Sequence, residues 1–109
     1  MQDDVRGCID ALVQGSEVVL FMKGDFNAPM CGFSARAVQI LKACGLDAPR
    51  VVAVNVLADE EIRQAMKEYS QWPTFPQLYV RGEFIGGADI MTQMYEAGEM
   101  QALLKEGAA

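Results

Sequence analysis

Two short apolar runs, separated by an amphipathic segment, limit the possible folds of this chain more than any other sequence feature. The runs are EVVLFM at 17–22 and RVVAVNV at 50–56, and both are rich in β-branched residues. Such runs are typical of buried strands, whereas the apolar residues between them recur at helical spacing over about 32–43. Two strands joined by a helix are expected to lie parallel in one sheet. The chain therefore predicts an α/β fold.

Helical periodicity predicts further helices around these strands. Asp4 is the expected N-cap of a first helix that ends at Gly15, and Asp59 the expected cap of a third helix over about 60–70. The expected core-facing residues of the first two helices are Val5, Cys8, Ile9, Leu12 and Val13, and then Phe33, Ala37, Ile40, Leu41 and Cys44. The third helix is expected to turn Ile62, Ala65, Met66 and Tyr69 inward. Because free cysteine is among the most buried residue types, we interpret Cys8 and Cys44 as structural.

The C-terminal half predicts a hairpin and two helices. The segments QLYV at 77–80 and EFIG at 83–86 flank the dipeptide RG, which is typical of an antiparallel β-hairpin. GGADI begins a fourth helix that runs to about Ala97, and GEMQALLKE supplies a short last one. The order α-β-α-β-α-β-β-α-α predicts one small mixed sheet with helices on both faces. With 109 residues and no linker or repeat, we expect a single domain over 1–109.

Composition excludes several classes of function. The net charge of −6 opposes binding to phosphate backbones, so we expect no nucleic-acid partner. The chain has no histidine, which excludes Ser-His-Asp and Cys-His catalysis and His-ligated metals. No apolar run approaches the roughly 20 residues of a membrane span. Three irregularly spaced cysteines make no disulfide framework, so we expect a reducing compartment. This is the cytoplasm, or the mitochondrial matrix or plastid if the chain is a processed form.

Cys31, in the segment APMCGFSARAV, is the candidate reactive thiol. It lies at the start of the second predicted helix, where free N–H groups and the helix dipole favour the thiolate and lower the thiol pKa. Lys23, at the end of the first strand, is expected to add to this effect. A redox pair would place a second cysteine at position 34, but the residue there is Ser34. The alternative is a buried structural cysteine.

Cys31 has no obvious disulfide partner within the chain. Cys44 follows it by about 20 Å of helix, whereas a disulfide needs Cα atoms within about 7 Å. Disulfides of Cys31 are therefore expected with a small thiol or another protein.

Three weaker signals accompany the cysteine. If the Phe75–Pro76 bond in WPTFP is cis, Thr74 and Phe75 would turn backbone groups outward, where they could pair with an extended peptide; the alternative is an ordinary rigid turn. GGAD leaves helix N-terminal N–H groups for a carboxylate, and Asp89 would either cap that helix or accept from a ligand ammonium. Arg63 and Lys67 share one helical face, and this face is either solvated surface or a site that binds a carboxylate.

Taken together, KGDFNAPMCGFS, WPTFPQLYV and GGADI resemble the monothiol (CGFS-type) glutaredoxins of the thioredoxin-fold superfamily, over about 17–106. The resemblance implies a thioredoxin-like (glutaredoxin) fold, with a four-stranded mixed sheet flanked by helices, and a bound glutathione. The resemblance implies three contacts with glutathione. The glycine carboxylate would be held by the cations Lys23 and Arg63, and the cysteinyl part would pair with the backbone of Thr74 and Phe75 before a cis Pro76. The γ-glutamyl end would be held at a helix start by Gly87, Ala88 and Asp89.

The resemblance also implies a [2Fe-2S] cluster shared by a homodimer. Two Cys31 thiolates and two glutathiones would supply the four ligands that such a cluster needs. The implied function is iron–sulfur cluster assembly or transfer, with BolA-like proteins and iron–sulfur acceptor proteins as partners. One alternative is a glutathione-dependent thiol–disulfide oxidoreductase, weak at most, that uses Cys31; another is a redox sensor that is only glutathionylated there. The sequence departs from the family pattern at Ala88, where many relatives have cysteine or serine, and at Asn55, where aspartate is common.

Overall fold

The computed structural model describes residues 3–106. Its helices are α1 (Asp3–Gln14), α2 (Gly32–Ala43), α3 (Glu60–Ser70), α4 (Ala88–Glu96) and α5 (Glu99–Glu106), with two short 3-10 helices, η1 (Ala48–Arg50) and η2 (Val56–Ala58). Its strands are β1 (Val18–Met22), β2 (Gly24–Asp25), β3 (Ala28–Pro29), β4 (Val52–Asn55), β5 (Gln77–Val80) and β6 (Glu83–Gly86).

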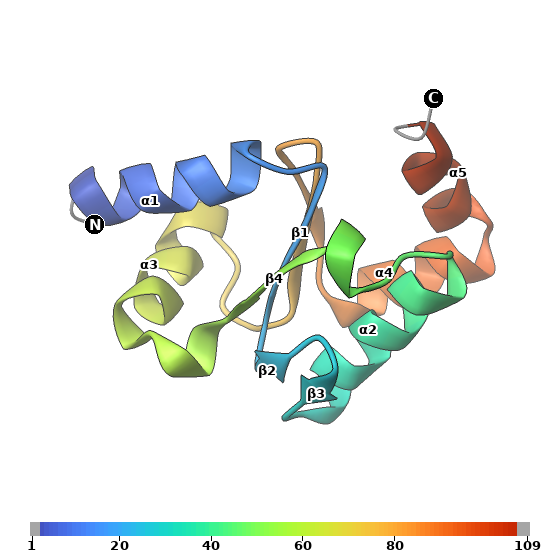
Figure 1. The fold of residues 1–109 in the computed structure, drawn as a ribbon, viewed down its shortest axis with the longest axis horizontal. Coiled ribbons are helices and arrows are strands. Elements are labelled where there is room, and N and C mark those ends of the chain that lie inside the picture. The colour runs from blue at the N-terminus through green and yellow to red at the C-terminus, as the bar shows by residue number, and fades with distance from the viewer. Residues whose placement is uncertain (1–2, 107–109) are drawn as a thin grey trace.

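The main sheet has the strand order β4-β1-β5-β6. Strand β1 runs parallel to β4 and antiparallel to β5, and β5 and β6 form the expected hairpin. Helices cover both faces of this sheet, with α1 and α3 on one side and α2, α4 and α5 on the other (Figure 1). The predicted four-stranded mixed sheet flanked by helices is therefore confirmed.

Side-chain alternation along β1 divides the core into two layers. All five residues of this central strand are buried. Val18, Leu20 and Met22 pack with residues of α2, α4 and α5, whereas Val19 and Phe21 pack with residues of α1 and α3. Successive side chains of a strand point to opposite faces, so a continuously apolar strand needs helices on both sides.

Two expected core residues are exposed. Cys8 is exposed, because α1 packs along the narrow row Val5, Ile9 and Val13, and Cys8 lies outside that row. Phe33 is 63% exposed, because the first turn of α2 borders the groove described below and not the core. Cys44 is half-buried against the core, and burial raises the pKa of its thiol, in keeping with a structural role.

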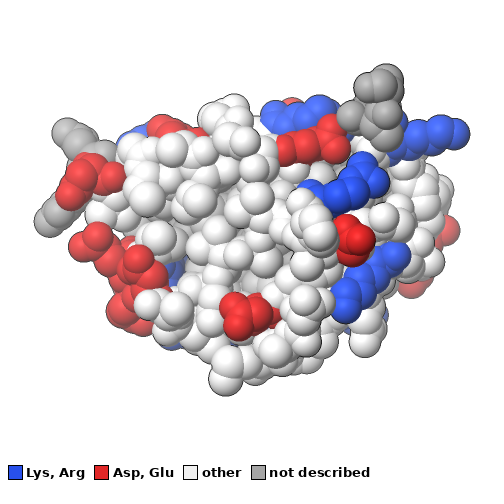
Figure 2. All heavy atoms as spheres, in the orientation of Figure 1, with Lys and Arg blue, Asp and Glu red and all other residues white. Residues whose placement is uncertain are grey.

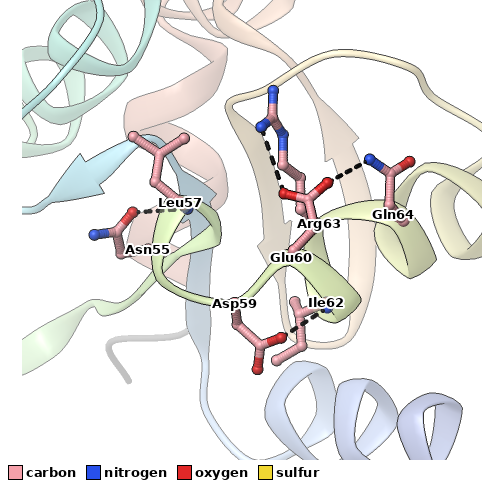
Figure 3. A network of polar contacts seen from close by, with 7 residues as sticks. All are labelled: Asn55, Leu57, Asp59, Glu60, Ile62, Arg63 and Gln64. Atoms are coloured by element: carbon pink, nitrogen blue, oxygen red, sulfur yellow. Dashed lines mark hydrogen bonds and ion pairs between the residues drawn. The ribbon is translucent and has the colours of Figure 1, made fainter.

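Local differences from the predicted boundaries have simple causes. Helix α1 begins at Asp3, so Asp4 lies inside its first turn and is not the N-cap. The second predicted strand is shortened to β4, because η1 with its proline occupies residues 48–50. Between β1 and α2, the chain forms the small antiparallel pair β2 and β3. Asp59 caps α3 as expected, and its side chain accepts from the Ile62 N–H at 3.1 Å (Figure 3).

The surface charge is unevenly distributed. In Figure 2, acidic side chains gather at the end of the molecule that carries α1 and α3, and most of the visible basic ones lie toward the opposite end. Within 3–106, no helix combines the length and apolarity that crossing a bilayer requires.

Candidate functional site

Cys31 occupies the N-cap position of α2. Its backbone is extended, with φ −152° and ψ 156°, and its Sγ accepts a hydrogen bond from the Ser34 N–H at 3.3 Å. This is the role that serine or aspartate usually plays at a helix start, where free N–H groups need acceptors. The thiol is half-exposed. The alternative of a buried structural cysteine is therefore excluded.

Ser34 contacts the thiol directly. Its side chain is fully buried, and its Oγ lies 3.4 Å from the Cys31 Sγ and accepts from the Lys23 N–H at 3.0 Å. A hydroxyl has one hydrogen to donate, and with Oγ already accepting from Lys23, that hydrogen is available to a thiolate at Cys31. From the sequence, Ser34 was expected only to replace the second cysteine of a redox pair. Its place three residues after the N-cap, where N–H groups point back to the cap, was the available signal.

The pKa of Cys31 is lowered, as the helix-start position predicts. Burial of the thiol acts in the opposite direction, since it disfavours the charged form. Hydrogen bonds from the Ser34 side chain, then from the Ser34 and Phe33 backbone, outweigh it, and the charge of Lys23 makes a further, smaller contribution. Lys23 therefore acts as predicted, but local hydrogen bonds matter more.

A groove of about 360 Å³ lies beside this thiol. It is lined by all eight residues implied for glutathione: Lys23, Arg63, Thr74, Phe75, Pro76, Gly87, Ala88 and Asp89. Cys31 itself does not line it, and the groove meets α2 at Phe33. Trp72, Pro73 and Ile90 also line it and were not predicted. Sequence segments far apart in the chain thus meet at one surface.

The groove is lined by Lys23, which directly follows β1, and by cations of α3. The Arg63 guanidinium lies 3.7 Å from a Glu60 carboxylate oxygen, and that carboxylate also accepts from the Gln64 amide at 2.7 Å (Figure 3). The Nε of Arg63 is buried without a hydrogen-bond partner among the described residues. Lys67 lines the same groove. Because Arg63 lines the groove, its guanidinium is placed to meet a carboxylate there.

The start of α4 supplies a second kind of contact. Gly87 is the N-cap, and no side chain caps this helix in the part of the chain that the structure describes. Asp89 lies in the first turn with an exposed side chain, so it is not the cap. An uncapped helix start with free N–H groups suits an anion, and a free carboxylate beside it suits an ammonium.

The 72–76 loop forms the remaining wall. The Phe75–Pro76 peptide is cis, as predicted, with Phe75 buried and Thr74 exposed. A Cβ added to Gly87 would lie 3.3 Å from both the Pro76 carbonyl oxygen and the Trp72 Nε1. The loop and the start of α4 therefore approach each other closely, and glycine at position 87 leaves room between them.

Comparisons with known proteins agree with this geometry. The Glutaredoxin family model matches residues 18–85. The mitochondrial monothiol glutaredoxin-5 of Schizosaccharomyces pombe is 44% identical over 97% of this chain and 73% of its own length. The chain belongs to the monothiol glutaredoxins. Glutaredoxin 4 of Escherichia coli is 48% identical over 93% of this chain and 85% of its own.

Solved glutaredoxin structures share the fold. The solution structure of reduced poplar apo GrxS14 matches with a TM-score of 0.79 at 47% identity, over 94% of this chain and 91% of that one. A buckwheat glutaredoxin–glutathione complex matches with a TM-score of 0.83 at 20% identity, over 100% and 97%, and at that identity the likeness concerns the fold alone. This glutaredoxin therefore has the thioredoxin-like fold.

This glutaredoxin offers few ligands for a metal. Among residues 3–106, no three His, Cys, Asp or Glu side chains come together in a group that could hold a metal ion. Its other cysteines, Cys8 on α1 and the half-buried Cys44, do not share the site of Cys31. A single chain thus presents one stabilised thiolate.

Proposed function

We propose that this glutaredoxin binds glutathione beside Cys31 and that two chains share a [2Fe-2S] cluster, which the protein assembles or transfers. The observation that carries this proposal is a single thiol of lowered pKa beside a groove that is lined by an arginine and by an uncapped helix start. The groove provides contacts for a zwitterionic peptide, and the thiol provides a soft ligand for iron.

Glutathione fits the groove group by group. Its glycine carboxylate would pair with Lys23 and Arg63, whose Nε lacks a partner in the described structure. Its cysteinyl unit would pair with the backbone of Thr74 and Phe75. Its γ-glutamyl carboxylate would meet the start of α4, and its ammonium would meet Asp89. The buckwheat complex supports this proposal through the shared fold.

Cluster ligation follows from counting thiolates. A [2Fe-2S] cluster takes four, and the described residues of one chain bring only Cys31 to this surface. Two chains and two glutathiones would complete the set, which makes the proposed carrier a homodimer. Met30 and Phe33 flank Cys31 and are 69% and 63% exposed. Exposed apolar side chains around the thiol favour contact with a second protein surface. BolA-like proteins and iron–sulfur acceptor proteins are the proposed partners.

Anaerobic reconstitution with iron, sulfide and glutathione tests this function. We expect a brown dimer on a sizing column, formed only when glutathione is present. Cys31→Ser should stay colourless, whereas Cys44→Ser, a matched change at the half-buried thiol, should still become brown. Colourless wild-type protein, or equal colour in Cys31→Ser, would refute the proposal.

The lowered pKa of Cys31 also favours a second function, glutathione-dependent reduction of mixed disulfides. The thiolate would attack the glutathione sulfur of a glutathionylated protein, forming a Cys31–glutathione disulfide while the protein sulfur leaves as a thiolate and takes a proton from water. A second glutathione thiolate would then attack this disulfide, releasing oxidised glutathione and the Cys31 thiolate. Turnover that is lost in Cys31→Ser would support this activity, and equal rates in the variant would refute it.

The proposed compartment is one that keeps thiols reduced. A reduced Cys31 is required for both functions, because a disulfide at its sulfur would remove the thiolate. The relatives compared above include a mitochondrial protein and a bacterial one. Cytoplasm, mitochondrial matrix and plastid all meet the chemical requirement.

A further inference from the structure

The 72–76 loop lines the groove without belonging to a strand or helix. It connects α3 to β5. Backbone groups outside regular structure need partners from side chains, water or ligands. The loop keeps one conformation only if such partners hold it. The side chains that bond its carbonyl groups therefore decide which of its backbone groups face a ligand.

Gln77 supplies two of these partners from the first position of β5. Its side chain is fully buried, and its Nε2 donates to the Trp72 carbonyl and to the Thr74 carbonyl, each at 3.1 Å. A primary amide has two N–H donors, and both are used on the loop. Because carbonyl groups only accept, a flipped amide would place Oε1 against them. The two contacts therefore fix the orientation of the amide.

The carbonyl oxygen of the Gln77 amide, in contrast, is unfavourable for the stability of the fold. The Oε1 of Gln77 is buried and has no partner in the described part of the chain. A buried acceptor without a donor destabilises the folded state, and an apolar side chain of similar shape would avoid this. The benefit of glutamine here must therefore come from its two donated hydrogen bonds.

The amide is anchored to the rigid part of the fold. Gln77 pairs with Phe21 of the central strand β1. The start of the loop is tied separately to α3, because the Ser70 Oγ accepts from the Trp72 N–H at 3.2 Å and donates to the Met66 carbonyl at 2.7 Å. With its start fixed by Ser70, the loop is fixed in its middle by Gln77.

We propose that Gln77 is a positioning residue that holds the 72–76 loop in its ligand-binding conformation. By bonding the carbonyls on both sides of Pro73, it leaves Thr74 and Phe75 placed to pair with an extended ligand. It also sets where Trp72 lies against Gly87 at the start of α4. Gln77 itself does not line the groove. This inference rests on the proposed glutathione site.

The experiment compares Gln77→Met and Gln77→Glu with wild type. Both variants keep the shape of the side chain and lose its N–H donors, and the second remains informative if the first does not fold. Calorimetry would measure the Kd of S-methylglutathione, which cannot form a disulfide. Acrylamide quenching would report on Trp72, the only tryptophan in the chain. The pH dependence of Cys31 alkylation would show whether the thiol side of the site is intact.

Two controls separate positioning from general destabilisation. Gln101→Glu removes an amide that donates to the Tyr95 carbonyl in another part of the molecule, and Val13→Ala opens a space under α1 in the core. If Gln77 positions the loop, its variants bind about tenfold more weakly and Trp72 becomes more accessible to acrylamide. Alkylation of Cys31 stays as in wild type, and both controls bind normally.

Unchanged affinity and quenching in a folded Gln77 variant would overturn the inference. So would an affinity loss that Val13→Ala reproduces in proportion to its lower stability. If wild type itself fails to bind S-methylglutathione, the proposed glutathione site falls. Trp72 quenching then still decides whether Gln77 holds the loop.

Discussion

Replacing Ser34 by alanine should raise the pKa of Cys31 and slow its reactions. The change removes the hydroxyl 3.4 Å from the Cys31 Sγ but keeps the Ser34 backbone donor at 3.3 Å. A hydrogen bond to a charged group contributes roughly 1.5–3 kcal/mol. Because this contact is long and the thiol is half-exposed, we take about 1–1.5 kcal/mol, which shifts the equilibrium between thiol and thiolate about five- to twelvefold toward the thiol.

Alkylation by iodoacetamide, followed by peptide mass spectrometry, measures this effect for each cysteine separately. We expect the pH profile of Cys31 alkylation to move to higher pH in Ser34→Ala, so that the rate at pH values below the pKa falls about five- to twelvefold. Cys44 is an internal control, because burial and not Ser34 determines its pKa. If the Cys31 profile does not move, the helix start alone stabilises the thiolate and the assigned role of the hydroxyl is wrong.

The same substitution should also destabilise the fold. Alanine leaves the Lys23 N–H without the Oγ that accepts from it at 3.0 Å, and an unsatisfied buried donor costs about 1–3 kcal/mol. Because the folded pKa of Cys31 is lowered, its contribution to wild-type stability grows as pH rises from the folded toward the unfolded pKa. That contribution is lost as pH falls through the folded pKa. Urea titrations of Ser34→Ala should show a smaller gain with pH.

Other features of the fold give three further predictions. Asp59→Ala removes the cap of α3 and should lower the free energy of unfolding in urea by about 1 kcal/mol; an unchanged midpoint would contradict this. Gly82→Ala places a side chain at φ +80° and should lower the melting temperature, at a cost of about 1–2 kcal/mol. Burial, then the hydrogen bond to Asp10, raises the pKa of Tyr69 to about 12, so stability should fall as pH rises through that value. In Tyr69→Phe this alkaline loss should be smaller.

Periodicity predicted the fold because each helix and strand buries its own stripe of side chains. Helix α3 was placed correctly, and its cap at Asp59 follows from a local hydrogen bond. The same reasoning failed at Cys8 and Phe33, since a stripe does not reveal how wide the contact is or where a helix extends past the core. Those limits depend on the neighbouring elements, which are distant in the sequence.

The charged residues of the candidate site could also be predicted from the sequence, but their spatial arrangement could not. Lys23, Arg63 and Asp89 carry the charges that a peptide ligand needs, and the sequence displays them directly. That they line one groove depends on three separate segments meeting at one surface. The proposed role of Gln77 was not predictable, because a glutamine at the start of a strand does not indicate which groups its amide will bond. Only the path of the 72–76 loop brings two carbonyls to its amide.

Local sequence patterns were enough to predict the helix start at Cys31, the lack of a second thiol at position 34 and the order of the elements. These are local properties, since they depend on residues within a few positions of each other. The tertiary structure decided what surrounds the thiol. The Lys23 N–H, eleven positions earlier, donates to the Ser34 hydroxyl oxygen and leaves the hydroxyl hydrogen available to Cys31. Packing of β1 beside the start of α2 sets the contact with Lys23, whereas the contact between Ser34 and Cys31 follows from their spacing of three residues at the helix start.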